Sequence, residues 1–355
     1  MSGMLDQDGI WPQTRMRAIT TGEATKTPAI KVERLRKLLE TKVPSICVIR
    51  GEGIGDVIMT TPTVVALHEM FSAAQITYST NIRYLDGALK KVLLYNPNIH
   101  QIIDREELQP DKYDLVVNLH CPCFGYETRE NPPVNRIDLF ANHAGMRLKD
   151  PVPKYYITDD EINVGSDILS PYMGDKLVLV QPFASCESRS FEHEKLKLAL
   201  IQLSKEGIRS VVIQHKKDWK SGTLWDNIPG VVPLHDADTR QIAGVMAHCD
   251  MVLCPDSSIL HLAGCLGTPT VSLFGPTHPA ARINHYKNAI AIWEGEGLNP
   301  CPCWGRTPCP VGYACWKRLT TERIVSTCLS HLKNTQRIPL DQLLKSPMLQ
   351  TMAVR

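Results

Sequence analysis

Residues 46–56 of this chain read ICVIRGEGIGD, an apolar run followed by three closely spaced glycines and an aspartate. The apolar run predicts a buried strand, and the glycines predict a tight turn that a ligand can approach closely. The next stretch, Asp56 to Phe71, has the spacing of a helix. This order of strand, turn and helix indicates a parallel sheet with helices on its faces.

The glycine-rich turn excludes two common nucleotide sites. It is not the G-x-G-x-x-G dinucleotide fingerprint, because its third glycine comes one residue early, and it lacks the Gly-Lys-Ser/Thr of a P-loop. Asp56 lies at or near the predicted helix N-terminus. It is therefore either a capping carboxylate or a base that the helix dipole keeps ionised.

The alternation of strands and helices stops at the proline-containing stretch 150–175, a predicted linker, and then starts again. The sequence thus predicts two consecutive α/β units, with a ligand crevice beyond the carboxyl ends of their strands. The further predicted strands are Gln75–Ser79, Ile99–Ile103, Leu115–Leu119, Leu177–Gln181, Ser210–Ile213, Met251–Cys254 and Thr270–Phe274. The further predicted helices are Glu194–Lys205, Thr239–Ala247 and Ser257–Leu266.

Length and composition fit two globular domains. The chain has 355 residues, of which 43% are hydrophobic and 21% charged, and this excludes a wholly disordered chain. A net charge of +2 excludes a protein that coats nucleic acid through bulk charge. Because no apolar segment resembles a membrane span or a signal peptide, we expect a cytoplasmic protein.

Basic residues collect at both ends of the chain. Residues 1–45 carry eight Lys and Arg against five acids, and residues 311–355 carry seven against two. Such ends suit an anionic acceptor or peripheral contact with the inner membrane surface, although solvated tails explain them better.

A second motif, CPDSSILHLAG at residues 254–264, again has the order of strand, turn and helix. We expect Asp256 to be the N-cap, with the backbone N–H groups and hydroxyls of Ser257 and Ser258 forming an anion site suited to a diphosphate. His261 lies one turn deeper on the same face. Capping alone explains Asp256, but the four polar residues together favour a phosphate site.

With these two motifs the chain resembles the ADP-heptose:lipopolysaccharide heptosyltransferases and the wider glycosyltransferase family 9, over about residues 45–330. The likeness rests on Gly55-Asp56-Val57-Ile58 with Thr61-Pro62, on Asp256-Ser257-Ser258 with His261-Leu262-Ala263, and on Phe274-Gly275-Pro276-Thr277. The cysteine-rich stretch 301–315, followed by Leu319-Thr320-Thr321-Glu322, is also similar to members of that family.

The resemblance implies a GT-B fold, in which two Rossmann-like parallel-sheet domains face a central crevice. Its expected parts are a tail with a short helix at 1–44, an acceptor domain at 45–155, a nucleotide-sugar domain at 172–320 and a C-terminal helix and tail at 321–355. It also implies an inverting transfer that needs no metal.

The resemblance also assigns roles to residues of this chain. It implies that Asp56 is the general base and that Asp256, Ser257 and Ser258 hold the donor diphosphate, while His261 matches the family's histidine. Two departures stand out, because Ser258 replaces a usual glycine and Arg189-Ser190-Phe191 replaces a Lys-x-Trp pattern. We expect Arg189 to clamp a phosphate, with an exposed surface arginine as the alternative. Asp218 is a weaker candidate for the donor ribose.

Four cysteines lie within 15 residues: Cys301, Cys303, Cys309 and Cys315. Four thiolates suit a structural Zn or Fe ion. The C-x-C opening is tighter than usual metal spacing, so a thiol-lined loop without metal is the favoured alternative. Cys121-Pro122-Cys123 repeats the opening tripeptide.

The leading hypothesis is a glycosyltransferase that moves a sugar, heptose above all, from a nucleotide-sugar such as ADP-heptose. The expected acceptor is a hydroxyl of a lipopolysaccharide core, a lipid-linked glycan or a protein, with nucleic acid a weaker option. One alternative is a GT-B nucleotide-sugar epimerase, which would release its product without any acceptor. The other is a catalytically degenerate binding module, which loss of the base would favour, but Asp56 is present.

Overall fold

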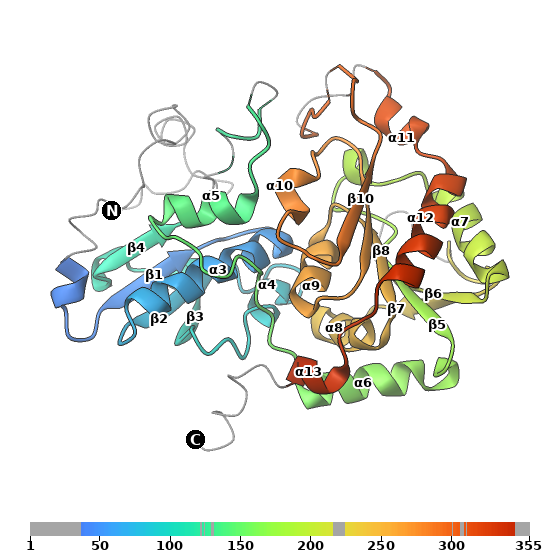
Figure 1. Cartoon of the computed structure of the whole chain (residues 1–355). Coiled ribbons are helices and arrows are strands. Elements are labelled where there is room, and N and C mark those ends of the chain that lie inside the picture. The colour runs from blue at the N-terminus through green and yellow to red at the C-terminus, as the bar shows by residue number, and fades with distance from the viewer. Residues whose placement is uncertain are drawn as a thin grey trace.

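The computed structural model describes residues 37–120, 123, 125–128, 131–215, 224–299, 301–305, 309 and 311–344. Within these residues the strands form two separate sheets, one in each half of the molecule (Figure 1). Every strand pairing is parallel. The α/β class with two parallel sheets, predicted from sequence, is confirmed.

The sheet of the N-terminal half has the strand order β3-β2-β1-β4. Its strands are β1 (Ser45–Ile49), β2 (Gln75–Thr80), β3 (Gln101–Asp104) and β4 (Leu115–Asn118). The sheet of the C-terminal half has the order β10-β9-β8-β5-β6-β7. Its strands are β5 (Lys176–Val180), β6 (Ile208–Gln214), β7 (Val231–His235), β8 (Met251–Pro255), β9 (Thr270–Phe274) and β10 (Ala289–Trp293).

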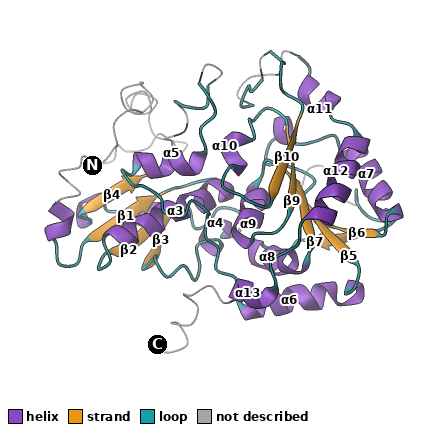
Figure 2. Cartoon of the chain, in the orientation of Figure 1, coloured by secondary structure: helices purple, strands orange, loops and turns teal. Residues whose placement is uncertain are grey.

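Helices cover both sheets and also connect the two halves (Figure 2). Helix α3 packs against α5 of its own half and against α9 of the other half. The helices after residue 53 are α3 (Ile54–Met70), α4 (Ala88–Lys91), α5 (Arg136–His143), α6 (Asp159–Leu169), α7 (His193–Lys205), α8 (Thr239–His248), α9 (Ser258–Leu266), α10 (Ala280–Ile283), α11 (Ala314–Arg318), α12 (Thr321–Asn334) and α13 (Leu340–Leu344). Short 3₁₀ turns occur at Arg105–Glu107, Pro110–Lys112, Ser170–Tyr172 and Glu187–Arg189.

The apolar runs that predict strands are buried. Ile46 and Val48 of β1 are fully buried, because both faces of a parallel sheet are covered by helices. One continuous apolar core extends from β1 and α3 in the N-terminal half to α8 and α9 in the C-terminal half. This shared core fixes the position of the carboxyl ends of one sheet relative to those of the other.

The sequence analysis missed β7 and β10, which are the two edge strands of the larger sheet. Strand β7 contains Pro233, a residue that argues against a strand except at a sheet edge. Both strands are half-exposed along most of their length, so neither has the continuous apolar run of the central strands. Edge position thus explains both omissions.

The stretch 150–175 is not an extended linker, since it contains helix α6. Thr158 and Glu161 form a capping box at its start, a signal that the prolines of this stretch obscured. The helix crosses α8 very closely, and a Cβ atom at Gly165 would overlap the backbone of Gly244. Two facing glycines therefore permit this contact.

The strands of the two sheets fall inside the ranges 45–155 and 172–320 expected for two domains, and the exact boundaries stay a prediction. Helix α12, expected in a separate C-terminal segment, packs on α7 of the C-terminal half. Residues 1–36 lie outside the described residues. Among the helices of the described part, none has the length and apolar character needed to cross a membrane.

Replacing Gly165 by alanine is expected to lower the free energy of unfolding by about 1–3 kcal/mol, as overpacking does elsewhere. The new methyl group collides with the α8 backbone, and this outweighs the gain of about 1 kcal/mol in helix propensity. Chemical denaturation measures the difference. Val164→Ala, at an exposed position of the same helix, is the control, and its effect is expected to stay within about 0.5 kcal/mol. An unchanged or higher stability of Gly165→Ala would contradict the tight crossing.

Candidate active site

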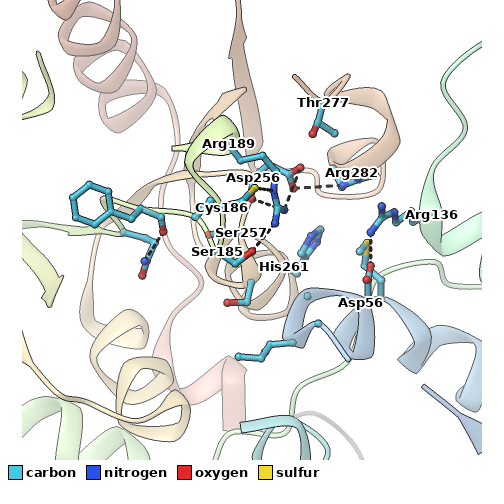
Figure 3. A pocket seen from close by; sticks show the side chains of 18 of the residues that line it. Asp56, Arg136, Ser185, Cys186, Arg189, Asp256, Ser257, His261, Thr277 and Arg282 are labelled. Carbon is cyan, nitrogen blue, oxygen red and sulfur yellow. Dashed lines mark hydrogen bonds and ion pairs between the residues drawn. The ribbon is translucent and has the colours of Figure 1, made fainter. Parts of the chain in front are cut away.

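The two sheets open at their carboxyl ends onto one cavity of about 470 Å³ (Figure 3). The N-terminal half contributes the start of α3, with Asp56, and the start of α5, with Arg136. The C-terminal half contributes Arg189, Arg282 and the start of α9. All six residues predicted for catalysis and donor binding line this cavity: Asp56, Arg189, Asp256, Ser257, Ser258 and His261.

Asp56 is held between two guanidinium groups. Its Oδ1 accepts a hydrogen bond from Arg136 at 2.6 Å, and its Oδ2 accepts one from Arg50, which also donates to the His120 carbonyl. Burial alone would raise the pKa of Asp56, but the charges of Arg136, Arg50 and Arg282 outweigh it and hold the pKa well below its usual range. Asp56 is therefore ionised at neutral pH and only weakly basic.

Ion pairs continue from Arg136 across the cavity to the other half. Glu127 accepts hydrogen bonds from Arg136 at 2.5 and 2.7 Å and from Arg282 at 2.9 Å. Arg282 in turn lies 3.4 Å from Asp256, and Arg189 lies 3.8 Å from the same carboxylate. Charges of alternating sign thus connect Asp56 of the N-terminal half with Asp256 of the C-terminal half.

The N-terminus of α9 is open toward the cavity. Its N-cap is Ser257 and not the predicted Asp256, whose carboxylate is instead occupied by Arg189 and Arg282. The Ser257 side chain makes no capping hydrogen bond, and its buried hydroxyl has no hydrogen-bond partner among the described residues. An uncapped helix start beside two arginines is suited to bind an anion.

Arg189 is held in place by the loop that follows β5. Its guanidinium donates to the Asp256 carbonyl at 3.1 Å, to Ser185 Oγ at 2.6 Å and to Cys186 Sγ at 3.2 Å. Figure 3 shows Arg189, Ser185 and Cys186 together beside Ser257. Arg189 thus lines the cavity near Ser257, and its expected contact with a phosphate stays a prediction.

His261 of the C-terminal half lines the cavity and lies against Gly55 of the N-terminal half. Its Nδ1 shares a hydrogen bond of 2.7 Å with the Tyr286 hydroxyl, and burial lowers the pKa of His261 to about 4, so the imidazole is neutral at pH 7. A Cβ atom at Gly55 would lie only 2.5 Å from His261 Cδ2. The third glycine of the first motif therefore permits α3 to approach α9.

A second cavity of about 580 Å³ adjoins the first and shares Ile54, Leu85, Gln181, His215 and Ser258 with it. Apolar side chains from both halves form much of its wall, which also contains three carboxylates. The apolar residues are Ile54, Ile58, Ile242, Ile259 and Leu262, and the carboxylates are those of Asp86, Asp236 and Asp238.

The four clustered cysteines lie close enough for the other three to affect the pKa of Cys301. Cys301 and Cys315 form a thiol hydrogen bond, and burial together with the neighbouring thiols raises the pKa of Cys301 to about 12. In the part of the chain that the structure describes, no three Cys, His, Asp or Glu side chains come together in a way that could hold a metal ion. A structural metal at this loop stays a prediction from sequence. Asp218, Cys121 and Pro122 lie outside the described residues.

The sequence analysis missed Glu127, Arg136, Arg282 and Trp304, all of which line the cavity. For one of them, Arg136, the sequence contains a feature that points to a functional position. Arg136 is the first residue of α5, behind the N-cap Asn135, where the helix dipole disfavours a cation. A cation in that place indicates an anionic partner, which here is Asp56 and Glu127.

Comparison with known families identifies the architecture. Residues 125–308 match the model of glycosyltransferase family 9 (heptosyltransferase), which is just over half of the chain. No curated protein sequence gives a significant match.

Solved structures of this family share the fold. A glycosyl transferase of family 9 from Veillonella parvula is 18% identical and superposes with a TM-score of 0.64 over 82% of this chain and 98% of its own. ADP-heptose lipopolysaccharide heptosyltransferase II of E. coli is 18% identical, with a TM-score of 0.61 over 82% and 99%. The dodecameric iron-containing heptosyltransferase TibC of E. coli, in complex with ADP-D-β-D-heptose, is 15% identical, with a TM-score of 0.59 over 82% and 76%. These likenesses confirm the GT-B fold.

The buried neutral His261 is expected to make folding stability depend on pH. An unfolded chain binds a proton at this histidine below about pH 6.5, whereas the folded chain does so only near pH 4. Stability is therefore lost as pH falls from 6.5 to 4, by up to about 3 kcal/mol for this group. Thermal or chemical unfolding across that range should show a shallower fall in His261→Asn. His193→Asn, at a half-exposed position, is the control, and an identical fall in His261→Asn would contradict the assignment.

Proposed function

Because the chain belongs to glycosyltransferase family 9, we propose that it transfers heptose from ADP-heptose to a hydroxyl of a lipopolysaccharide core or a protein, with inversion at the anomeric carbon. The observation that carries the proposal is the shared cavity, in which Asp56 from one half faces the open start of α9 from the other. Transfer needs a proton acceptor beside the attacking hydroxyl and hydrogen-bond donors beside the leaving diphosphate, on opposite sides of the sugar.

The donor diphosphate is proposed to bind at the start of α9. The Ser257 hydroxyl and the backbone N–H groups there supply hydrogen bonds, and Arg189 and Arg282 supply positive charge. Charge-assisted hydrogen bonds of this kind are strong, and they stabilise the negative charge that develops on the departing nucleoside diphosphate. We therefore propose that no metal ion is needed for catalysis.

The second cavity is suited to the donor nucleoside. Its apolar wall, with Ile242, Ile259 and Leu262, offers a surface for a base, and its carboxylates are acceptors for ribose hydroxyls. Ser258 lines both cavities, so a nucleoside in the second would place its diphosphate beside Ser257 in the first. The transferred sugar then extends toward Asp56.

Asp56 is proposed to receive the proton of the acceptor hydroxyl. A carboxylate with so low a pKa is a weak base, so it takes the proton late, when the bond to the anomeric carbon has made the acceptor oxygen strongly acidic. Arg50 and Arg136 hold both carboxylate oxygens in place and keep the group ionised. They thus fix the orientation of the base at the expense of its strength.

Calorimetric titration with ADP, UDP, GDP and CDP tests the donor site. We expect selective binding of ADP, weakened about tenfold in Ser257→Ala because a hydrogen bond to a charged group contributes about 1.5 kcal/mol. Asp56→Asn should bind ADP as the wild type does, since Asp56 lies on the acceptor side. Binding of none of the four nucleotides would contradict the proposal and favour a binding module that has lost its donor.

Transfer kinetics test the base. Asp56→Asn is expected to lower kcat by about 10²- to 10⁴-fold, the usual contribution of a general base. Glu52→Gln is the matched control, because Glu52 lies in the same glycine-rich turn but is exposed and pairs with Arg105.

Folding must be checked in the same experiment, since asparagine leaves Arg50 and Arg136 without their shared carboxylate. Thermal unfolding and the affinity for ADP provide that check. A folded, ADP-binding Asp56→Asn enzyme with near-normal kcat would exclude Asp56 as the base.

A further inference from the structure

The loop that carries Cys301 and Cys303 places an indole ring in the first cavity. Trp304 lines this cavity and is half-buried there. Its backbone N–H donates to the Pro276 carbonyl at 2.9 Å, and a Cβ atom at the next residue, Gly305, would lie 2.9 Å from Ser188 Oγ. The loop is therefore packed on the same segments of the C-terminal half that surround the proposed diphosphate site.

Trp304 is also fixed from the opposite half. Its indole N–H donates to the Thr128 carbonyl at 3.2 Å, across the opening between the halves. Its backbone adopts φ of 59°, a left-handed conformation that costs a bulky residue about 1–3 kcal/mol. Such strain persists where the surroundings impose it, and it is most common at ligand-binding sites. Contacts from both halves thus hold this ring in one orientation.

The position of the ring along the cavity suggests what it contacts. Trp304 is absent from the wall of the second cavity, so it stands away from the proposed nucleoside site. Its ring centroid lies 5.9 Å from the guanidinium of Arg282, which pairs with Asp256. The indole therefore lies beside Arg282, whose guanidinium pairs with both Asp256 and Glu127 in the first cavity.

We propose that Trp304 is a positioning residue for the transferred sugar, and that its ring packs against the C–H face of the donor pyranose. An aromatic ring offers a large, rigid apolar surface at little cost in side-chain entropy. With the indole N–H already donated to Thr128, the ring offers its face and not a hydrogen bond. This inference rests on the proposed function, and it assigns a role in substrate binding to the segment 301–305.

Calorimetry with two ligands tests the inference. The dissociation constants of ADP and ADP-heptose are measured for the wild type, Trp304→Ala and Trp304→Phe. We expect Trp304→Ala to weaken ADP-heptose about fivefold to tenfold, as loss of an aromatic contact does, while ADP stays within about twofold. Trp304→Phe keeps an aromatic face and should retain most of the affinity for ADP-heptose. Trp293→Phe, at a tryptophan that does not line the cavity, is the control.

The outcomes separate this inference from the proposed function. Failure of the wild type to bind ADP or ADP-heptose would reject the proposed donor and the sugar contact with it. If the wild type binds both ligands, an unchanged affinity of Trp304→Ala for ADP-heptose would overturn the inference alone. Equal weakening of ADP and ADP-heptose would also overturn it, because the residue would then act on the nucleotide or on the fold.

Discussion

The close approach of Gly55 and His261 is the constraint on which the site depends. Helix α3 of the N-terminal half meets α9 of the C-terminal half there, with room for a hydrogen atom but not for a methyl group. Both helices begin at the same cavity, and their starts carry Asp56 and Ser257. A bulkier residue at position 55 would separate the two starts, and the groups proposed for the acceptor and the donor would no longer share one cavity.

The carboxylates that line the cavity are paired with arginines, and this pairing affects both their burial and their basicity. Two carboxylates from different halves, Asp56 and Asp256, are each held by arginines, and Glu127 connects the two sets. Buried charges are tolerated because each has partners of opposite sign. The same pairing lowers the basicity of Asp56, so a low pKa accompanies the fixed position of its carboxylate. The proposed sugar transfer is compatible with a weak base, since the attacking oxygen becomes acidic during the reaction.

Much of the fold followed from local sequence pattern, and the failures have identifiable causes. Central strands such as β1 and β8 were predicted because burial on both faces requires an unbroken apolar run. The edge strands β7 and β10 lack that run, and β7 also contains a proline. Helix α6 was hidden by neighbouring prolines, although its capping box is visible in the sequence.

The residues of the candidate site also fall into two groups, those that the sequence identified and those that it missed. Asp56, Asp256, Ser257 and His261 were identifiable because each belongs to a contiguous strand–turn–helix motif, whose geometry is set by neighbours in the chain. Glu127, Arg136, Arg282 and Trp304 lie on loops and short helices, and the first two are far in sequence from the last two. Their importance arises from contacts between the two halves, including the bonds of Glu127 to Arg282 and of Trp304 to Thr128. The sequence alone thus determined the central strands of the two sheets and the motif residues at their carboxyl ends, since backbone periodicity and glycine turns are local properties. Only the tertiary structure decided which charges pair, how basic Asp56 is and where the indole lies, because burial and long-range ion pairs depend on how the two halves meet.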